Sequence, residues 1–188
     1  MMKNSRERYG SISKILHWLI AFLLFFLIPL GWYMSGLDNE DPWYYRALDL
    51  HLTLGLIVLG LFLIKIVWLL MSPSPQLSAR LAKWEHRTAR WVHGALIIAL
   101  GVVPLTGYLS YTSQGDPVSI YELFEIPSVM EFSKDGAERL VALHMYLAYA
   151  TAIIALFHLS AALKHHFLDG DDILKRMGFS RSSRPGQS

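Results

Sequence analysis

Apolar residues gather in four long stretches of this chain, at 13–35, 48–71, 91–112 and 139–163, with polar segments between them. Ionised side chains are rare inside these stretches and stand mostly near their ends, with Lys65 the deepest exception. About 20 apolar residues are enough for a helix to cross a bilayer, and a helix in a soluble core is seldom apolar on every face for so long. The pattern predicts an all-α integral membrane protein, a bundle of four transmembrane helices.

Composition agrees with a membrane protein and narrows the chemistry. Of the 188 residues 53% are hydrophobic and 17% are charged, whereas a soluble domain carries about 25% charged residues. The chain has no cysteine. This excludes disulfides, iron–sulfur clusters and the thioether attachment of a c-type haem, so any haem must be held without covalent bonds to the protein.

The connecting segments predict a single membrane domain followed by a tail. Pro73 and Pro75 stop the second helix, because proline cannot continue it. A short interfacial helix is expected from Ile120 to Phe124 in the loop before the fourth span. We expect the transmembrane domain to cover 1–168, and the polar tail at 169–188 to be partly disordered.

Basic residues predict how the bundle is oriented. Most of the 17 Lys and Arg residues precede the first span, follow the second or follow the fourth, while the two opposite loops are rich in Asp and Glu. Because Lys and Arg collect on the cytoplasmic side, both termini are predicted to be cytoplasmic. The net charge of +2 then reflects topology, and lipid rather than nucleic acid is the expected surroundings.

Histidines are the main candidates for chemistry, and two of them share one helix. His144 and His158 are 14 residues apart in the fourth span. Fourteen helical residues make roughly four turns, so both rings leave the helix on nearly the same face, about 21 Å apart along its axis. Ionisable groups inside membrane spans are usually functional, so the spacing suggests two metal centres at different depths.

Depth in the bilayer predicts a partner for each of these two rings. His51 lies near the outer end of the second span, at the level of His144, and His17 lies near the inner end of the first span, at the level of His158. We interpret the pairs as axial ligands of two b-type haems, because two imidazoles on one iron favour electron transfer over oxygen binding. For any single histidine, a hydrogen-bonded core position or an interfacial one remains an alternative.

Three more polar residues fall on the inner side. Lys65 is 14 residues after His51 and so on the same helix face, where its cation could meet a haem propionate or a quinone, or could instead reach the inner interface. His93 and His165 could bind the carbonyls of a quinone and exchange protons with it, or be solvated at the interface.

Several segments of the chain resemble the bacterial cytochrome b561 family. They include Ser13-Lys14-Ile15-Leu16-His17-Trp18, Asp49-Leu50-His51, Pro104-Leu105-Thr106-Gly107-Tyr108, Ala142-Leu143-His144 and His158-Leu-Ser-Ala-Ala-Leu-Lys-His165-His166. The resemblance covers essentially the whole chain. It implies a four-helix, multi-pass protein of the bacterial inner membrane that holds two b haems on His17, His51, His144 and His158. Through the superoxide oxidases of the family, it further implies electron transfer from periplasmic superoxide to ubiquinone, with His93 and His165 on the quinone side.

The charges of the outer loops indicate which electron donor the protein could accept. They carry many carboxylates against only three cations, Arg46, Lys134 and Arg139, which are the candidates for admitting superoxide. An acidic rim would equally suit a donor protein with a basic face. The preferred hypothesis is therefore an oxidoreductase that links an outer donor to a quinone. A membrane-anchor cytochrome for a separate periplasmic enzyme and a non-redox transporter or scaffold are the alternatives.

Overall fold

The computed structural model describes residues 1–5, 8–76, 81–120 and 124–178. Its four long helices are α1 (Ser11–Ser35), α2 (Pro42–Met71), α3 (Lys83–Tyr111) and α4 (Lys134–Phe167). Each is long and apolar enough to cross a membrane. The four predicted spans are thus confirmed, and every one of them gains helix beyond its apolar stretch, because polar residues outside the hydrocarbon continue the helical hydrogen bonding.

Local capping explains where two of these helices begin. The Asp41 carboxylate accepts a hydrogen bond from the backbone N–H of Trp43 at 2.8 Å, and Pro42 occupies the first helical position of α2, where its missing N–H has no cost. Ser133 caps α4 in the same way by accepting from the N–H of Gly136. Both helices therefore start several residues ahead of the apolar stretch from which they were predicted.

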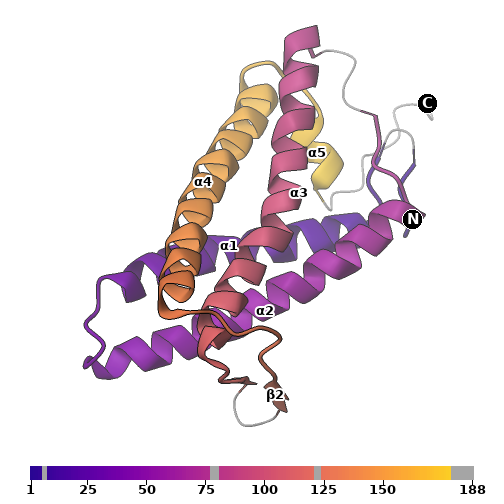
Figure 1. Cartoon of the computed structure of the whole chain (residues 1–188). Coiled ribbons are helices and arrows are strands. Elements are labelled where there is room, and N and C mark those ends of the chain that lie inside the picture. Colours follow the sequence, from indigo (N-terminus) through magenta and orange to yellow (C-terminus); the bar gives the residue numbers. More distant parts are fainter. Residues whose placement is uncertain (6–7, 77–80, 121–123, 179–188) are drawn as a thin grey trace, which may run out of the picture.

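The helices are arranged as two hairpins, α1 with α2 and α3 with α4, and α2 packs against α3 to join them. Figure 1 shows the α3–α4 hairpin crossing the α1–α2 hairpin. The buried core sits at this crossing and consists of Ile20, Leu23, Leu27, Val58 and Leu100. Most other large apolar side chains, such as Phe25 and Leu70, face outward, as expected when lipid is the surrounding solvent.

The loop between α3 and α4 contains strand rather than the helix expected from Ile120 to Phe124. After a turn of 3-10 helix, Thr112–Gln114, strand β1 (Val118–Ile120) pairs antiparallel with β2 (Phe124–Ile126). The expected helix was therefore wrong at Ile120 and at Phe124, which lie in strands. Residues 121–123 between them lie outside the described residues. Ile120 instead pairs with Phe124 across the two strands, and in the same ladder Val118, a β-branched residue that favours strands, pairs with Ile126 and is 1% exposed.

The N-terminal segment, the end of α2 and the segment after α4 meet at one end of the molecule. Asn4 hydrogen-bonds to Ser72 through both its backbone N–H and its side chain, each at 2.9 Å. A short helix that the sequence did not predict, α5 (Ile173–Met177), follows α4, and the indole N–H of Trp18 donates to the carbonyl of Met177. Helix α4 ends one residue before the domain boundary expected at 168, and α5 lies within the expected tail. The tail from 179 onward, expected to be disordered, lies outside the described residues.

Two helical glycines give a matched test of the core. A Cβ on Gly101 would lie 2.8 Å from the ring of Phe62, whereas a Cβ on Gly60 would meet nothing within 4 Å. We expect Gly101→Ala to lower the free energy of unfolding by about 1–3 kcal/mol through overpacking. Gly60→Ala should raise it by about 0.5–1 kcal/mol, because alanine loses less backbone entropy in a helix. Denaturant unfolding in detergent measures both values, and equal effects would contradict the packing of α3 on α2.

Candidate functional site

Near the start of α2 and of α4, two imidazoles face each other across the bundle. The ring centres of His51 and His144 lie 6.1 Å apart, with the ring planes nearly perpendicular at 86°. The two residues stand 93 positions apart in the sequence, and the depth argument placed them at one level. The structure brings the predicted outer pair together.

Hydrogen bonding fixes the orientation of one of these rings. Nδ1 of His144 lies 2.9 Å from the carbonyl oxygen of Val103, and the Thr106 hydroxyl donates to the same carbonyl at 2.8 Å. Because a carbonyl can only accept, Nδ1 of His144 carries the proton and Nε2 keeps its lone pair. Metal-bound histidines are commonly oriented by such a bond. On the facing ring, Nδ1 of His51 is buried and has no hydrogen-bond partner among the described residues, so a ring nitrogen there is also available to a metal.

Two glycines make room for the outer pair. A Cβ on Gly107 would lie 2.9 Å from Cε1 of His144, and a Cβ on Gly31 would lie 3.0 Å from Cε1 of His51. Any side chain at either position would push an imidazole out of place. Gly107 lies in one of the segments that resemble the family, whereas Gly31 was not identified from the sequence. The position of Gly31 near the end of an apolar span, two residues after Pro29, was the signal that could have found it.

The loop before α4 covers the outer pair. Val118 of strand β1 lines a small cavity together with His51, His144 and Gly55, and a Cβ on Gly55 would meet nothing within 4 Å. Hydrogen bonds hold the loop against the end of α3, from the Tyr108 hydroxyl to the carbonyl of Pro127, from Ser128 to Thr112 and from the N–H of Phe132 to Ser113. The outer imidazoles thus lie beneath a strand, with open space on the Gly55 face of α2.

The inner group contains three imidazoles rather than two. The ring centres of His17 and His158 are 6.3 Å apart, and those of His93 and His158 are 5.1 Å apart. His17 and His158 are half-buried, whereas His93 is exposed. Lys65 is close enough to repel positive charge on both His17 and His93. The structure therefore gathers His17, His93, His158 and Lys65 at one depth, as their positions in the spans suggested.

Ring spacing tests which of these pairs fits an axially ligated metal. A metal–imidazole bond is about 2.0–2.1 Å long, so two ring centres on opposite sides of one ion lie about 6 Å apart. The separations of 6.1 Å for His51–His144 and 6.3 Å for His17–His158 match this value. The separation of 5.1 Å between His93 and His158 is too short. The two predicted ligand pairs fit a haem iron, and His93 instead packs beside one of the rings.

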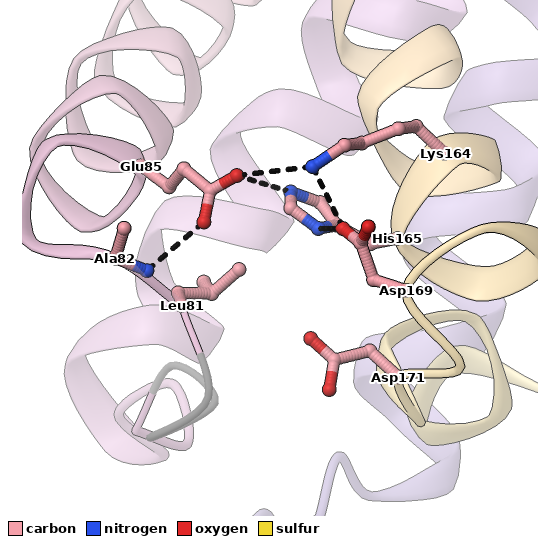
Figure 2. Close-up of a pocket in the computed structure, with 7 residues that line it drawn as sticks. All are labelled: Leu81, Ala82, Glu85, Lys164, His165, Asp169 and Asp171. Atoms are coloured by element: carbon pink, nitrogen blue, oxygen red, sulfur yellow. Dashed lines mark hydrogen bonds and ion pairs between the residues drawn. The ribbon is translucent and has the colours of Figure 1, made fainter.

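The structure places His165 in a separate cluster at the ends of α3 and α4. Its Nδ1 lies 2.7 Å from the carboxylate of Asp169, and its Nε2 lies 3.9 Å from that of Glu85. The ammonium of Lys164 pairs with the same two carboxylates at 2.7 and 3.2 Å. Figure 2 shows the four side chains pointing toward one another. No contact between His93 and His165 is found among the described residues, so the two suggested quinone-side histidines are not brought together.

The three outer cations stand at helix starts. The guanidinium of Arg46 lies 5.2 Å above the ring of Trp43 in the first turns of α2. Lys134 is the first residue of α4, and Arg139 follows less than two turns later on the same helix. A cation over an aromatic face keeps its charge while losing little solvation. All three positions are on the side of the bundle where His51 and His144 lie.

The complete sequence was compared with known proteins. A family model described as prokaryotic cytochrome b561 matches residues 8–180. The chain is similar to the protein named cytochrome b561 homolog 2 of Escherichia coli (strain K12), with 36% identity over 183 residues that cover 97% of each chain. It is also similar to a protein of Yersinia pestis named probable superoxide oxidase CybB, with 27% identity over 177 residues, which are 91% of this chain and 96% of the relative.

The cluster around Asp169 predicts a pH-dependent contribution to stability. The hydrogen bond from Lys164 lowers the pKa of the Asp169 carboxyl from its ordinary value of 3.8. Because the pKa is lower in the folded state, the carboxylate stabilises the fold above its ordinary pKa, and this stabilisation is lost as the pH falls through the folded-state pKa. Asp169→Asn should therefore lower the unfolding midpoint at pH 7, and the difference from the unmodified protein should shrink as the pH falls below 3.8 toward the lower pKa of the folded state.

Thermal unfolding in detergent between pH 7 and pH 3 measures that difference. Asp172→Asn is the matched control, since Asp172 pairs with Lys175 at 3.4 Å with both side chains 71% exposed, and it should have little effect at any pH. A difference for Asp169→Asn that stays constant over the whole pH range would contradict the pairing.

Proposed function

The chain belongs to the prokaryotic cytochrome b561 family, and we propose that it is a di-haem cytochrome that passes electrons from a donor on the outer side of the bilayer to a quinone near the inner side. Membership makes it a multi-pass, haem b-containing electron-transfer protein of the bacterial inner membrane. The observation that carries the finer proposal is the presence of two imidazole pairs, both at iron-bridging spacing, that share α4.

Four histidines would hold the two haems without covalent attachment. His51 and His144 form the outer site, and His17 and His158 form the inner one. When bound, each haem would supply reversible one-electron chemistry, and two imidazoles would hold each iron. The carbonyl of Val103 orients the His144 ring by accepting a hydrogen bond from it. Gly31 and Gly107 leave room for the two imidazoles of the outer site, and Gly55 leaves open space beside them. Strand β1 lines that site through Val118.

The quinone is proposed to bind beside the inner pair. His93 is exposed on α3 yet packs 5.1 Å from His158, so a quinone arriving through the lipid would meet its ring next to the inner haem. A neutral imidazole can donate to a quinone carbonyl from one nitrogen and accept a proton at the other. Lys65, close to the same rings, supplies the positive charge that favours a reduced quinone or a haem propionate.

Orientation follows from charge. Basic residues are frequent near both ends of the sequence, and the contacts of Asn4 with Ser72 and of Trp18 with Met177 lie at one end of the bundle. By the distribution of Lys and Arg, this side is proposed to be cytoplasmic. Electrons then move inward and quinone reduction takes protons from the inner side, so that the reaction would be linked to the membrane potential.

Superoxide is the proposed small-molecule donor, since one relative is named a probable superoxide oxidase. The overall reaction consumes two superoxide ions, one ubiquinone and two protons and yields two molecules of oxygen and one ubiquinol. Arg46, Lys134 and Arg139, at the starts of α2 and α4, are the cations that would attract the anion toward the outer haem.

A second candidate function is that of a membrane-anchor cytochrome b, which passes electrons between a separate periplasmic enzyme and quinone. The acidic outer segments favour it, because Asp38, Glu40, Asp41, Asp116, Glu125 and Glu131 would bind a basic protein face better than an anion. A redox partner that purifies with the chain, together with no haem reduction by superoxide, would establish this function instead.

Single-histidine variants test the two haem sites. His144→Ala should remove mainly the outer haem, and His158→Ala mainly the inner one, each lowering haem content from two to about one per chain because an iron with one imidazole is held weakly. The pyridine haemochrome assay together with protein quantification measures this content. His86→Ala, at the solvent end of α3, is the control and should keep both haems. Two haems retained in either test variant would show that the pairing by depth is wrong.

Stopped-flow spectroscopy with superoxide tests the whole proposal. Purified protein should show rapid haem reduction by superoxide, followed by reoxidation when ubiquinone is added. His93→Gln should retain both haems and slow the reoxidation at least about tenfold, the effect of losing one proton-transferring group. His86→Gln is the control. A colourless preparation would refute both redox functions and leave a transporter or scaffold, and normal reoxidation of His93→Gln would place the quinone elsewhere.

A further inference from the structure

The cluster of Glu85, Lys164, His165 and Asp169 lies at the inner end of the bundle, away from both imidazole pairs. It surrounds a cavity of about 300 Å³ that Leu81, Ala82 and Asp171 complete. Exposure falls from the rim inward, from 37% for the side chain of Asp169 to 16% for Glu85 and 12% for His165. In Figure 2 the imidazole stands between the two carboxylates. We propose that this cluster is the proton-entry site for quinone reduction, an inference that rests on the function proposed above.

Each ring nitrogen of His165 faces its own carboxylate. Nδ1 lies 2.7 Å from Asp169, which is a hydrogen bond, and Nε2 lies 3.9 Å from Glu85, a gap that a small ring rotation or one water molecule closes. An imidazole can take up a proton at one nitrogen and release one from the other. Asp169, Nδ1, Nε2 and Glu85 thus form a path that begins at the more exposed carboxylate and ends at the more buried one.

Neighbouring groups hold this path in place. The backbone N–H of Ala82 donates to Oε2 of Glu85 at 2.9 Å, which leaves Oε1 turned toward His165. Lys164 pairs with both carboxylates, and its positive charge reduces the cost of holding two negative groups close together. These are the charged groups that face His165 from its own helix, from α3 and from the segment after α4, together with Asp171 across the cavity.

The cluster lies on the route from the cytoplasmic side to the inner imidazoles. His165 follows His158 by seven residues, about two turns, and so lies on nearly the same face of α4, about 10 Å away along the axis. Glu85 precedes His93 by eight residues on α3, a similar rise. Three or four hydrogen bonds of about 2.8 Å span that distance, which a short chain of water molecules provides.

A metal ion is the competing occupant, and the position of Lys164 disfavours it. Ligand atoms of Glu85, His165 and Asp169 lie within 4.8 Å of one another, a spacing that could hold a cation. The ammonium of Lys164 already contacts both carboxylates, however, at 2.7 and 3.2 Å. A metal would have to displace it, whereas a proton moving through the cluster leaves every contact in place.

Quinone reduction consumes protons, and the proposed role of the cluster is to supply them. Each quinone takes up two electrons and two protons to become a quinol, and the protons must come from water because the donor supplies only electrons. In each transfer Asp169 passes a proton from the cytoplasmic water to Nδ1 of His165, Nε2 releases a proton to the Glu85 carboxylate, and Glu85 passes it on toward the quinone site and becomes a carboxylate again. Each transfer leaves the imidazole proton on Nδ1, so a ring flip or proton exchange with water returns the cluster to its starting state before the next transfer.

Two variants in the intact haem-loaded protein test the relay. Glu85→Gln keeps the acceptor for the N–H of Ala82 but carries no transferable proton, and His165→Gln removes the two-nitrogen ring. Protein reduced with dithionite under anaerobic conditions is mixed with a short-chain ubiquinone, and quinol formation is followed at pH 7.5. Both variants should bind two haems, accept electrons from dithionite at the normal rate and form quinol at least about tenfold more slowly, with an enlarged solvent isotope effect.

Small acids distinguish a relay from a structural role. Acetate, which can carry protons into the cavity, should restore at least half of the lost rate in Glu85→Gln, and Asp172→Asn should behave as the unmodified protein. The relay is refuted if both variants form quinol at the normal rate. It is equally refuted if their rates fall with no response to acetate and no change in isotope effect, because the cluster then only ties α3 to α4. Failure of the unmodified protein to reduce quinone would instead refute the proposed function.

Discussion

The spacing of the paired imidazoles, close to 6 Å from ring centre to ring centre, is the constraint on which the rest of this structure depends. Both pairs use α4, so the helix that supplies His144 and His158 must face α2 near one end and α1 near the other. This agrees with the crossing of the α1–α2 and α3–α4 hairpins (Figure 1). It also accounts for Gly31 and Gly107, which stand where any side chain would collide with an imidazole.

Lipid as the solvent explains why so little of the chain is buried. In water, four apolar helices would pack along their whole length to hide their side chains, but in a bilayer an outward Phe25 or Phe157 costs nothing. Helix contacts can then be limited to the small core around Val58 and to the polar contacts at the helix ends. The remaining helix faces leave open space at Gly55 and an exposed ring at His93, where we propose that a haem and the quinone bind.

The two ends of the bundle carry different kinds of polar chemistry. At the outer end a strand lies over His51 and His144, and acidic loop residues surround it. At the inner end Lys65, His93 and the cluster around His165 bring cations and proton-exchanging groups within about two to three helical turns of one another. This difference suits the proposed function, in which electrons enter near His51 and His144 and quinone is reduced with protons taken up near His93 and His165.

Sequence alone was enough for the four spans and for the histidine spacing, which each depend on a single long helix. Hydropathy gave the four spans, because burial in lipid acts on each segment independently, and the 14-residue interval placed His144 and His158 on one face, because helical periodicity is local. The depth of each histidine in its span also predicted which two histidines would lie together. The relations between helices needed the tertiary structure. No periodicity shows that His93 packs against His158, that Gly31 makes room for His51, or that His165 turns to Glu85. The loop before α4 was misread as helix, since strand pairing joins residues that are not neighbours in the chain. Such contacts are decided by how the helices cross, which is a property of the packed molecule and not of any one segment.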